Sequence, residues 1–230
     1  MRLPMLAAVI FDFDGVIVDS ECLHHRAFNL VCARFGIEIT TKDYYDKFLG
    51  FTDVEVFCQL SEANKLGWSP EQIEQLVEQK TAGFKRLAKS EAQLMPGVRE
   101  FIQMLKDNGI PMAISSGALL PEIELILEGA GLRNFFEPIV SAEQVKKGKP
   151  HPEGFLLALT KLNEKASRQI KANQCIVIED SRWGLVAAKA AGMHTIAVTN
   201  TYTANQLKPA DKIVSKLTDL TIRDLHNLCP

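Results

Sequence analysis

The chain has 230 residues, of which 47% are hydrophobic and 23% are charged, and its formal net charge is −2. This length allows one large core and a small second domain, while the near-neutral charge gives no basic surface for nucleic acid or an anionic membrane, so we expect a small-molecule partner. The five cysteines are scattered without a C-x-x-C pair and no apolar run reaches a membrane-spanning length of about 18 residues, so we expect a cytoplasmic protein without disulfides, signal peptide or membrane anchor.

The apolar run 7–11 predicts a buried strand, and two carboxylates, Asp12 and Asp14, follow it directly. From about residue 20 to 90 the apolar residues take helical spacing, which predicts a helical insertion. Ser69 precedes Pro70 and is expected to be a helix N-cap. The helices expected in this insertion lie near 23–35, 54–60 and 70–87.

Beyond a second linker at 95–97, helical stripes alternate with short apolar runs. The expected strands are 111–115, 138–141, 175–179, 195–198 and 213–214, and the expected helices are 98–105, 121–127, 152–162, 184–191 and 220–228. This alternation is typical of a doubly wound parallel (Rossmann-like) α/β sheet. We therefore predict an α/β core domain formed by residues 1–19 and 91–230, and an inserted helical domain at 20–90 that is suited to act as a lid.

Reactive side chains follow three of the expected core strands. Parallel strands have their carboxyl ends at one edge of the sheet, so these groups are expected to converge there, with a lysine from a loop between strands. Carboxylates, a lysine and a hydroxyl suit a hard cation and a phosphoryl group, and an aspartate can attack phosphorus to form an acyl-phosphate. The residues concerned are Asp12, Asp14, Ser115, Lys149, Glu179 and Asp180.

Four segments of the chain resemble, in order and spacing, the four motifs of haloacid dehalogenase superfamily phosphotransferases. They are Asp12-Phe13-Asp14-Gly15-Val16, Ser115 after a strand, Lys149-Pro150-His151-Pro152, and Glu179-Asp180-Ser181 with Gly184. The resemblance covers essentially the whole chain. The helical insertion resembles the small helical cap of that superfamily, and the overall likeness is to its β-phosphoglucomutase/phosphatase branch.

The resemblance implies a role for each acid and a Mg²⁺ cofactor. Asp12 would be the nucleophile and a Mg²⁺ ligand. Asp14 would be the general acid/base, and its backbone carbonyl would also bind the metal. Asp180 would ligate Mg²⁺, and Glu179 would ligate it or orient it through water.

The resemblance also implies that Ser115 and Lys149 hold the transferring phosphoryl group, with help from backbone N–H groups near Ser116 and Gly117. Substrate selectivity is expected in the helical insertion. Its candidate substrate-binding residues are His24, which could also assist proton transfer, and Gly50 and Thr52.

Mutases of this branch carry a loop resembling Lys-Gly-x-Ser-Arg, whose two cations hold a second phosphate. This chain has Leu49-Gly50-Phe51-Thr52-Asp53 at the corresponding place, without either cation. We therefore expect a Mg²⁺-dependent phosphatase, a monomer, that hydrolyses a small phosphorylated metabolite such as a sugar phosphate through an aspartyl-phosphate. A phosphosugar mutase and a non-catalytic phosphometabolite sensor are the alternatives.

Overall fold

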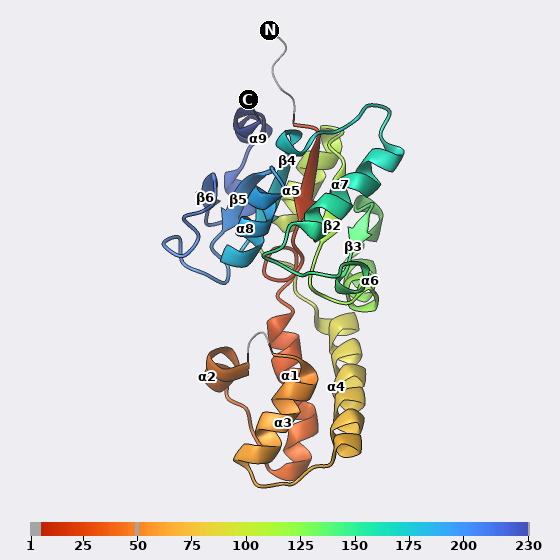
Figure 1. The fold of residues 1–230 in the computed structure, drawn as a ribbon, viewed down its shortest axis with the longest axis vertical. Coiled ribbons are helices and arrows are strands. Elements are labelled where there is room, and N and C mark those ends of the chain that lie inside the picture. The colour runs from red at the N-terminus through yellow and green to blue at the C-terminus, as the bar shows by residue number, and fades with distance from the viewer. Residues whose placement is uncertain (1–5, 49–50, 230) are drawn as a thin grey trace. The chain divides into compact units, whose positions relative to one another are not determined.

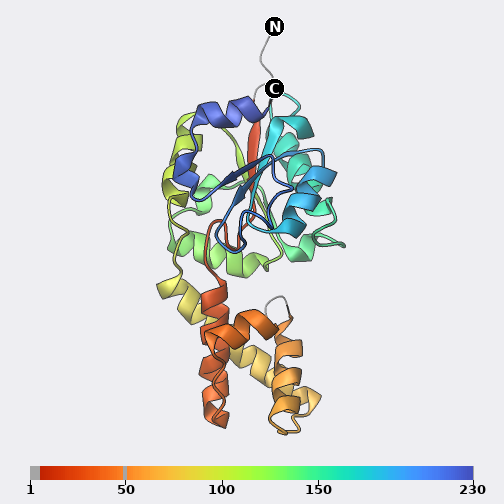
Figure 2. The ribbon, with the colours of Figure 1, turned by 90° about the vertical axis from the view of Figure 1, so that its left-hand side faces the viewer.

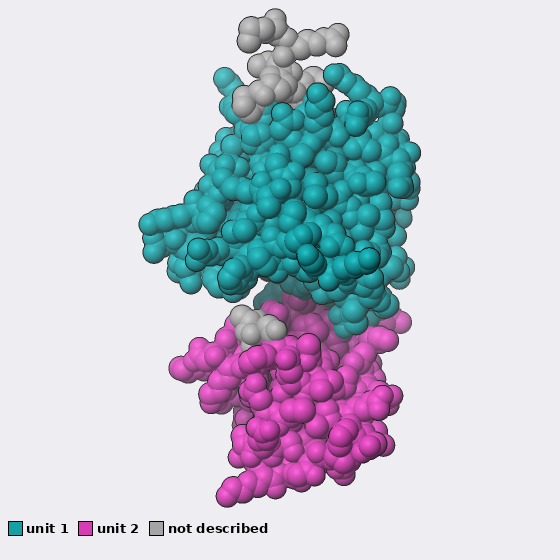
Figure 3. Space-filling view, viewed as in Figure 1, with its two compact units in different colours: residues 1–19, 93–230 teal, residues 20–92 magenta. Residues whose placement is uncertain are grey.

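The computed structural model describes residues 6–48 and 51–229. The chain forms two compact units, one comprising Met1–Asp19 with Gln93–Pro230 and the other Ser20–Ala92 (Figure 3). None of the helices in the described part of the chain is both long and apolar enough to cross a membrane.

The first unit is built on a parallel sheet, whose six described strands have the order β3-β2-β1-β4-β5-β6 (Figure 1). Phe11 of β1 is in register with Ile114 of β2 on one side and with Ile178 of β4 on the other. The prediction of a doubly wound parallel α/β fold is confirmed. The strands are β1 (Ala8–Phe11), β2 (Met112–Ser115), β3 (Ile139–Val140), β4 (Cys175–Glu179), β5 (His194–Val198) and β6 (Lys212–Val214).

Helices cover both faces of this sheet, with α5 and α9 on one face and α7 and α8 on the other (Figure 2). For this reason β1 and β4 are buried on both sides and read as continuous apolar runs rather than alternating ones. The Phe11 ring packs edge-on against Phe101 and Phe136. The helices are α5 (Val98–Asp107), α6 (Leu120–Gly129), α7 (Glu153–Lys165), α8 (Arg182–Ala190) and α9 (Ile222–Leu228).

The second unit is helical and has its own apolar core. Ser69 caps its longest helix as predicted, since its hydroxyl accepts a hydrogen bond from the Gln72 N–H at 3.3 Å. Two apolar residues of the helical spacing, Leu30 and Val54, are 53% and 49% exposed. Its helices are α1 (Glu21–Cys32), α2 (Thr41–Asp43), α3 (Asp53–Ala63) and α4 (Pro70–Glu91).

One part of this unit was not predicted from the sequence: the segment that contains α2 and a π-helical turn over Tyr44–Phe48. Tyr44 and Phe48 are its buried aromatic residues and lie four positions apart among polar neighbours. Such a short segment has too few apolar residues to display a helical period, so tertiary contacts fix its structure.

Candidate active site

Three buried carboxylates meet at the carboxyl edge of the sheet. Asp12 directly follows β1, Glu179 ends β4 and Asp180 comes next, and β1 and β4 are neighbours in the sheet. Each residue offers an oxygen within 4.8 Å of the others, and the three residues are at most 7% exposed. Parallel neighbouring strands thus bring together residues that are far apart in the sequence.

Lys149 joins two of these acids. Its ammonium donates to Asp12 Oδ1 and to Glu179 Oε1, both at 2.5 Å. It also lies 5.3 Å from the centre of the Phe155 ring. The neighbouring Lys146 and Lys147 are exposed, so the structure singles out one lysine of this loop for the acid cluster.

Burial and mutual repulsion shift the ionisation of these groups. Burial, together with Glu179 and Asp180, raises the pKa of Asp12 well above its usual value, although Lys149 opposes this. Burial and Glu179 raise the pKa of Asp180 to about 7. Burial alone would lower the pKa of Lys149, but Asp12 and Glu179 outweigh it and raise that pKa.

One ammonium therefore does not neutralise three buried acids. Carboxylate oxygens are the ligands that hard divalent cations prefer, so the donor set of Asp12, Glu179 and Asp180 fits a metal ion. Glu179 also has partners within the protein: its second oxygen, Oε2, accepts from the Asp180 N–H at 3.1 Å and from the Ser181 hydroxyl at 2.9 Å. Its role toward the metal, as a ligand or through water, stays a prediction. These bonds suit Glu179 to hold Lys149 and the strand end in place.

Asp14 lies outside this three-carboxylate cluster. The Ser116 hydroxyl donates to Asp14 Oδ2 at 3.4 Å and accepts from the Ala118 N–H at 2.9 Å. Asp14 is thereby tied to the loop after β2, the loop that the sequence predicts to hold a phosphoryl group. Its roles as acid/base and as carbonyl ligand stay predictions.

The turn after Asp14 requires glycine. Gly15 has φ +74°, and a Cβ at this position would lie 2.0 Å from Asp180 Oδ2. A larger residue would therefore be strained and would push against the acid cluster.

Two residues that support the acid cluster, both in the loop after β5, were not predicted from the sequence. The Asn200 side chain donates to the Gly15 carbonyl at 2.7 Å, and the Thr201 hydroxyl hydrogen-bonds to Asp180, which lowers the pKa of that acid and partly offsets its burial. Asn200 and Thr201 follow the end of the strand predicted at 195–198, and this position, like those of Asp12 and Glu179, was the signal available in the sequence.

His24 lies in the helical unit and accepts a hydrogen bond there. Its Nδ1 is 2.7 Å from the ammonium of Lys80, which also donates to Asp53 at 2.7 Å, and its ring stacks on Phe84. Burial, with the Lys80 charge, lowers the pKa of His24 to about 3. The imidazole is therefore neutral near pH 7 and a weak base, which disfavours the proton-transfer role considered for it. Contact with substrate stays a prediction.

Lys80 is only 2% exposed and was not among the residues predicted from the sequence. It lies four residues after Leu76 and four before Phe84, so it interrupts the buried stripe of α4. A charged residue inside an apolar stripe was the signal available in the sequence.

Thr52 and Gly50 are the remaining candidate substrate-binding residues of the helical unit. The Thr52 hydroxyl donates to Glu55 Oε2 at 2.8 Å and accepts from the Glu55 N–H, so it caps α3. Its binding to substrate stays a prediction. Gly50 lies outside the described residues.

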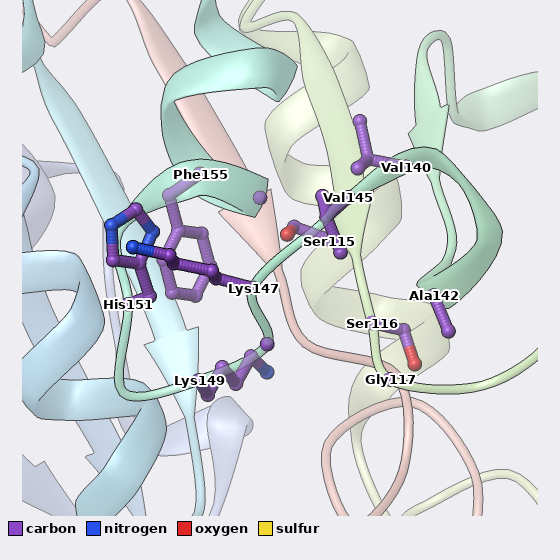
Figure 4. A pocket seen from close by; sticks show the side chains of 12 residues that line it. Ser115, Ser116, Gly117, Val140, Ala142, Val145, Lys147, Lys149, His151 and Phe155 are labelled. Atoms are coloured by element: carbon purple, nitrogen blue, oxygen red, sulfur yellow. The ribbon is translucent and has the colours of Figure 1, made fainter.

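The expected phosphoryl-binding residues Ser115, Ser116, Gly117 and Lys149 line one pocket of the first unit, of about 400 Å³ (Figure 4). Ser115 ends β2 beside β1 and is 3% exposed. A Cβ on Gly154, at the start of α7, would lie 2.6 Å from the Ser115 hydroxyl oxygen, so glycine leaves room for this hydroxyl. The structure thus brings these four residues together next to the acid cluster.

Known proteins similar to this chain include several phosphatases. The chain is 32% identical to hexitol phosphatase B of Escherichia coli over 222 residues, which is 96% of each chain. It is 34% identical to a phosphorylated carbohydrates phosphatase of Thermotoga maritima over 192 residues, 83% of this chain and 84% of that protein. The crystal structure of a β-phosphoglucomutase from Clostridium difficile matches with a TM-score of 0.74 and 28% identity, over 97% of this chain and 98% of the other.

Fold, site and relatives together define an enzyme of the phosphoric monoester hydrolase class, which confirms that prediction. Residues 9–198 match the family model described as haloacid dehalogenase-like hydrolase. The chain belongs to this family, as the four sequence motifs indicated.

Proposed function

We propose that this protein is a Mg²⁺-dependent phosphatase that hydrolyses a small sugar phosphate through an aspartyl-phosphate intermediate. The observation that carries the proposal is the surroundings of Asp12, a buried carboxylate paired with Lys149 at 2.5 Å and clustered with Glu179 and Asp180. A nucleophile, a cation for the phosphoryl oxygens and a set of metal ligands are the parts that phosphoryl transfer to an aspartate needs. The named activities of the two phosphatase relatives support this substrate class.

In the proposed reaction, the Asp12 carboxylate attacks phosphorus while the bond to the ester oxygen breaks. Asp14 gives a proton to the leaving alkoxide, and it then takes a proton from the water that attacks the aspartyl-phosphate. This second step releases inorganic phosphate and restores Asp12. Lys149 and the loop of Ser115 to Gly117 hold the phosphoryl oxygens, and bound Mg²⁺ would supply charge neutralisation.

Hydrolysis is favoured over phosphoryl transfer to a second sugar by the segment that resembles the mutase loop. Among its described residues, Phe51, Thr52 and Asp53, none is a cation. Asp53 is itself paired with Lys80 at 2.7 Å. These described residues therefore lack the charge-assisted contacts that would hold the second phosphate of a bisphosphate intermediate, which favours water as the acceptor. We also propose that the helical unit is the cap that selects substrate and excludes water.

The test is a panel of hexitol, hexose and pentose phosphates incubated with the protein and Mg²⁺. We expect release of inorganic phosphate from at least one of them, measured by a colorimetric phosphate assay. Formation of a phosphate isomer without release, detected by ³¹P NMR, would establish a mutase instead. Binding seen by calorimetry with neither product would establish a sensor.

Mg²⁺ is expected to raise the melting temperature more at pH 8 than at pH 6. The pKa of Asp180 is about 7 in the folded chain without metal and lower when unfolded, so the metal-free protein loses stability as the pH rises from about 4 to 7. Metal binding requires ionised carboxylates, so its stabilisation is fully available only above this range. Thermal melts with and without Mg²⁺ at both pH values measure the shift, and Asp180→Asn should remove it. A larger shift at pH 6 would contradict this account of the site.

A further inference from the structure

The pocket beside the acid cluster is larger than a phosphoryl group needs. Its volume is about 400 Å³, whereas one water molecule in the liquid takes about 30 Å³. Ser115 and Lys149, the residues proposed to hold the phosphoryl group, form part of its wall. A phosphate ester held by them therefore has room in the same pocket for part of the group that carries the phosphate.

One side of the pocket wall, opposite the loop of Ser116, is positively charged. Figure 4 shows Lys147 and His151 on one side and Ser116 and Ala142 on the other. None of the described residues that line the pocket is acidic. The charge of Lys149 is already matched by Asp12 and Glu179, so Lys147 is the cation that remains.

The Lys147 ammonium makes no ion pair or hydrogen bond with residues 6–48 or 51–229. Glu153, six residues after Lys147, accepts the backbone N–H groups of Lys146 and Lys147 at 2.9 and 3.2 Å. Its carboxylate therefore holds the loop in shape. The Lys147 side chain is left available to a ligand.

His151 presents a hydrogen-bond donor in the same wall. Its Nδ1 accepts the Glu153 N–H at 3.3 Å, so a neutral ring carries its proton on Nε2. Val140, Val145 and Phe155 supply the apolar part of the wall. Interactions with a charged group are stronger next to such apolar surface than in open water.

We propose that this pocket receives a second anionic group of the substrate, bound by Lys147 and His151, so that the enzyme prefers phosphate esters that also carry a carboxylate or a second phosphate. This inference rests on the proposed phosphatase function and specifies its substrate class. The described lining residues supply donors and a cation and include no acid, a combination that favours an anion over a neutral hydroxyl. The Glu153 carboxylate lies 3.7 Å from His151 Nδ1, but its two oxygens accept the backbone N–H groups of Lys146 and Lys147.

The experiment compares substrates that differ in one group. Glucitol 6-phosphate and 6-phosphogluconate form one pair, in which a terminal carboxylate replaces a hydroxymethyl group, and fructose 6-phosphate and fructose 1,6-bisphosphate test a second phosphate. We expect kcat/KM to be higher for the anionic member of at least one pair. Lys147→Ala should lower this selectivity ratio about tenfold, the size expected for losing one charge-assisted hydrogen bond.

Lys146→Ala is the matched control, because it removes the same charge from the adjacent residue, which does not line the pocket. Its selectivity ratio should equal that of the wild type, and Lys147→Arg should retain most of the preference. Equal kcat/KM within both pairs, or a ratio unchanged by Lys147→Ala, would overturn the inference.

Failure of the proposed function gives a different result, since no ester would then release phosphate. The pocket is tested in that case by isothermal titration calorimetry of the same pairs with the wild type and both alanine variants. Tighter binding of the anionic member that is lost only in Lys147→Ala supports the pocket. Equal binding of both members overturns it.

Discussion

Replacing Asp12 by asparagine is expected to lower the rate of phosphate release by a factor of about 10³ or more. An amide is neutral and a poor nucleophile, so no acyl-phosphate forms on it. The substitution changes few atoms, and Lys149 keeps its 2.5 Å contact with Glu179. The measurement is phosphate release from the best substrate of the panel at saturating Mg²⁺.

The same substitution should leave the metal-free protein at least as stable as the wild type at pH 8. Burial and neighbouring acids raise the pKa of Asp12, so its ionised form is unfavourable in the fold without a metal. Asp107→Asn, on the exposed surface of α5, is the control and should change neither activity nor melting temperature. More than a tenth of the wild-type activity in Asp12→Asn would rule out Asp12 as the nucleophile.

Gly184→Ala should destabilise the protein by about 3 kcal/mol and abolish most of its activity. A Cβ at this position would lie 1.6 Å from Glu179 Oε1, the atom that accepts from Lys149. The Gly184 N–H donates a hydrogen bond to the Ser181 hydroxyl at the start of α8. This bond opposes a shift of the helix away from Glu179. Glu179 must move instead, which leaves the half-buried ammonium of Lys149 with one partner fewer.

Urea unfolding measures the stability change, and Gly83→Ala provides the comparison. Gly83 lies within α4, where a Cβ would meet only Leu30 Cδ1 at an ordinary 3.7 Å. Because alanine favours a helix over glycine, Gly83→Ala should stabilise the protein by about 0.5–1 kcal/mol. The two substitutions are thus expected to have opposite signs. A Gly184→Ala protein as stable and active as the wild type would show that Glu179 does not depend on this close approach.

Much of the fold and part of the site follow from local sequence. The runs 7–11 and 175–179 are apolar because their strands are buried on both faces, and the acids that end them mark the edge of the sheet. Ser69 before Pro70 identifies a helix start by its own hydrogen bond to the following backbone. These features depend on neighbours a few residues away, so the sequence displays them directly.

Other features depend on partners that no local pattern contains. Lys149 and Asp12 are 137 residues apart, and only the fold selects this lysine over Lys146 and Lys147. Lys80 can be buried because its ammonium donates hydrogen bonds to Asp53 and His24, which lie far from it in the sequence of the helical unit. The sequence alone thus determined where the strands lie along the chain and which acids stand at their ends. The tertiary structure decided which charges are paired and which pocket wall keeps an unpaired cation, because desolvation and Coulomb energies depend on distances in space.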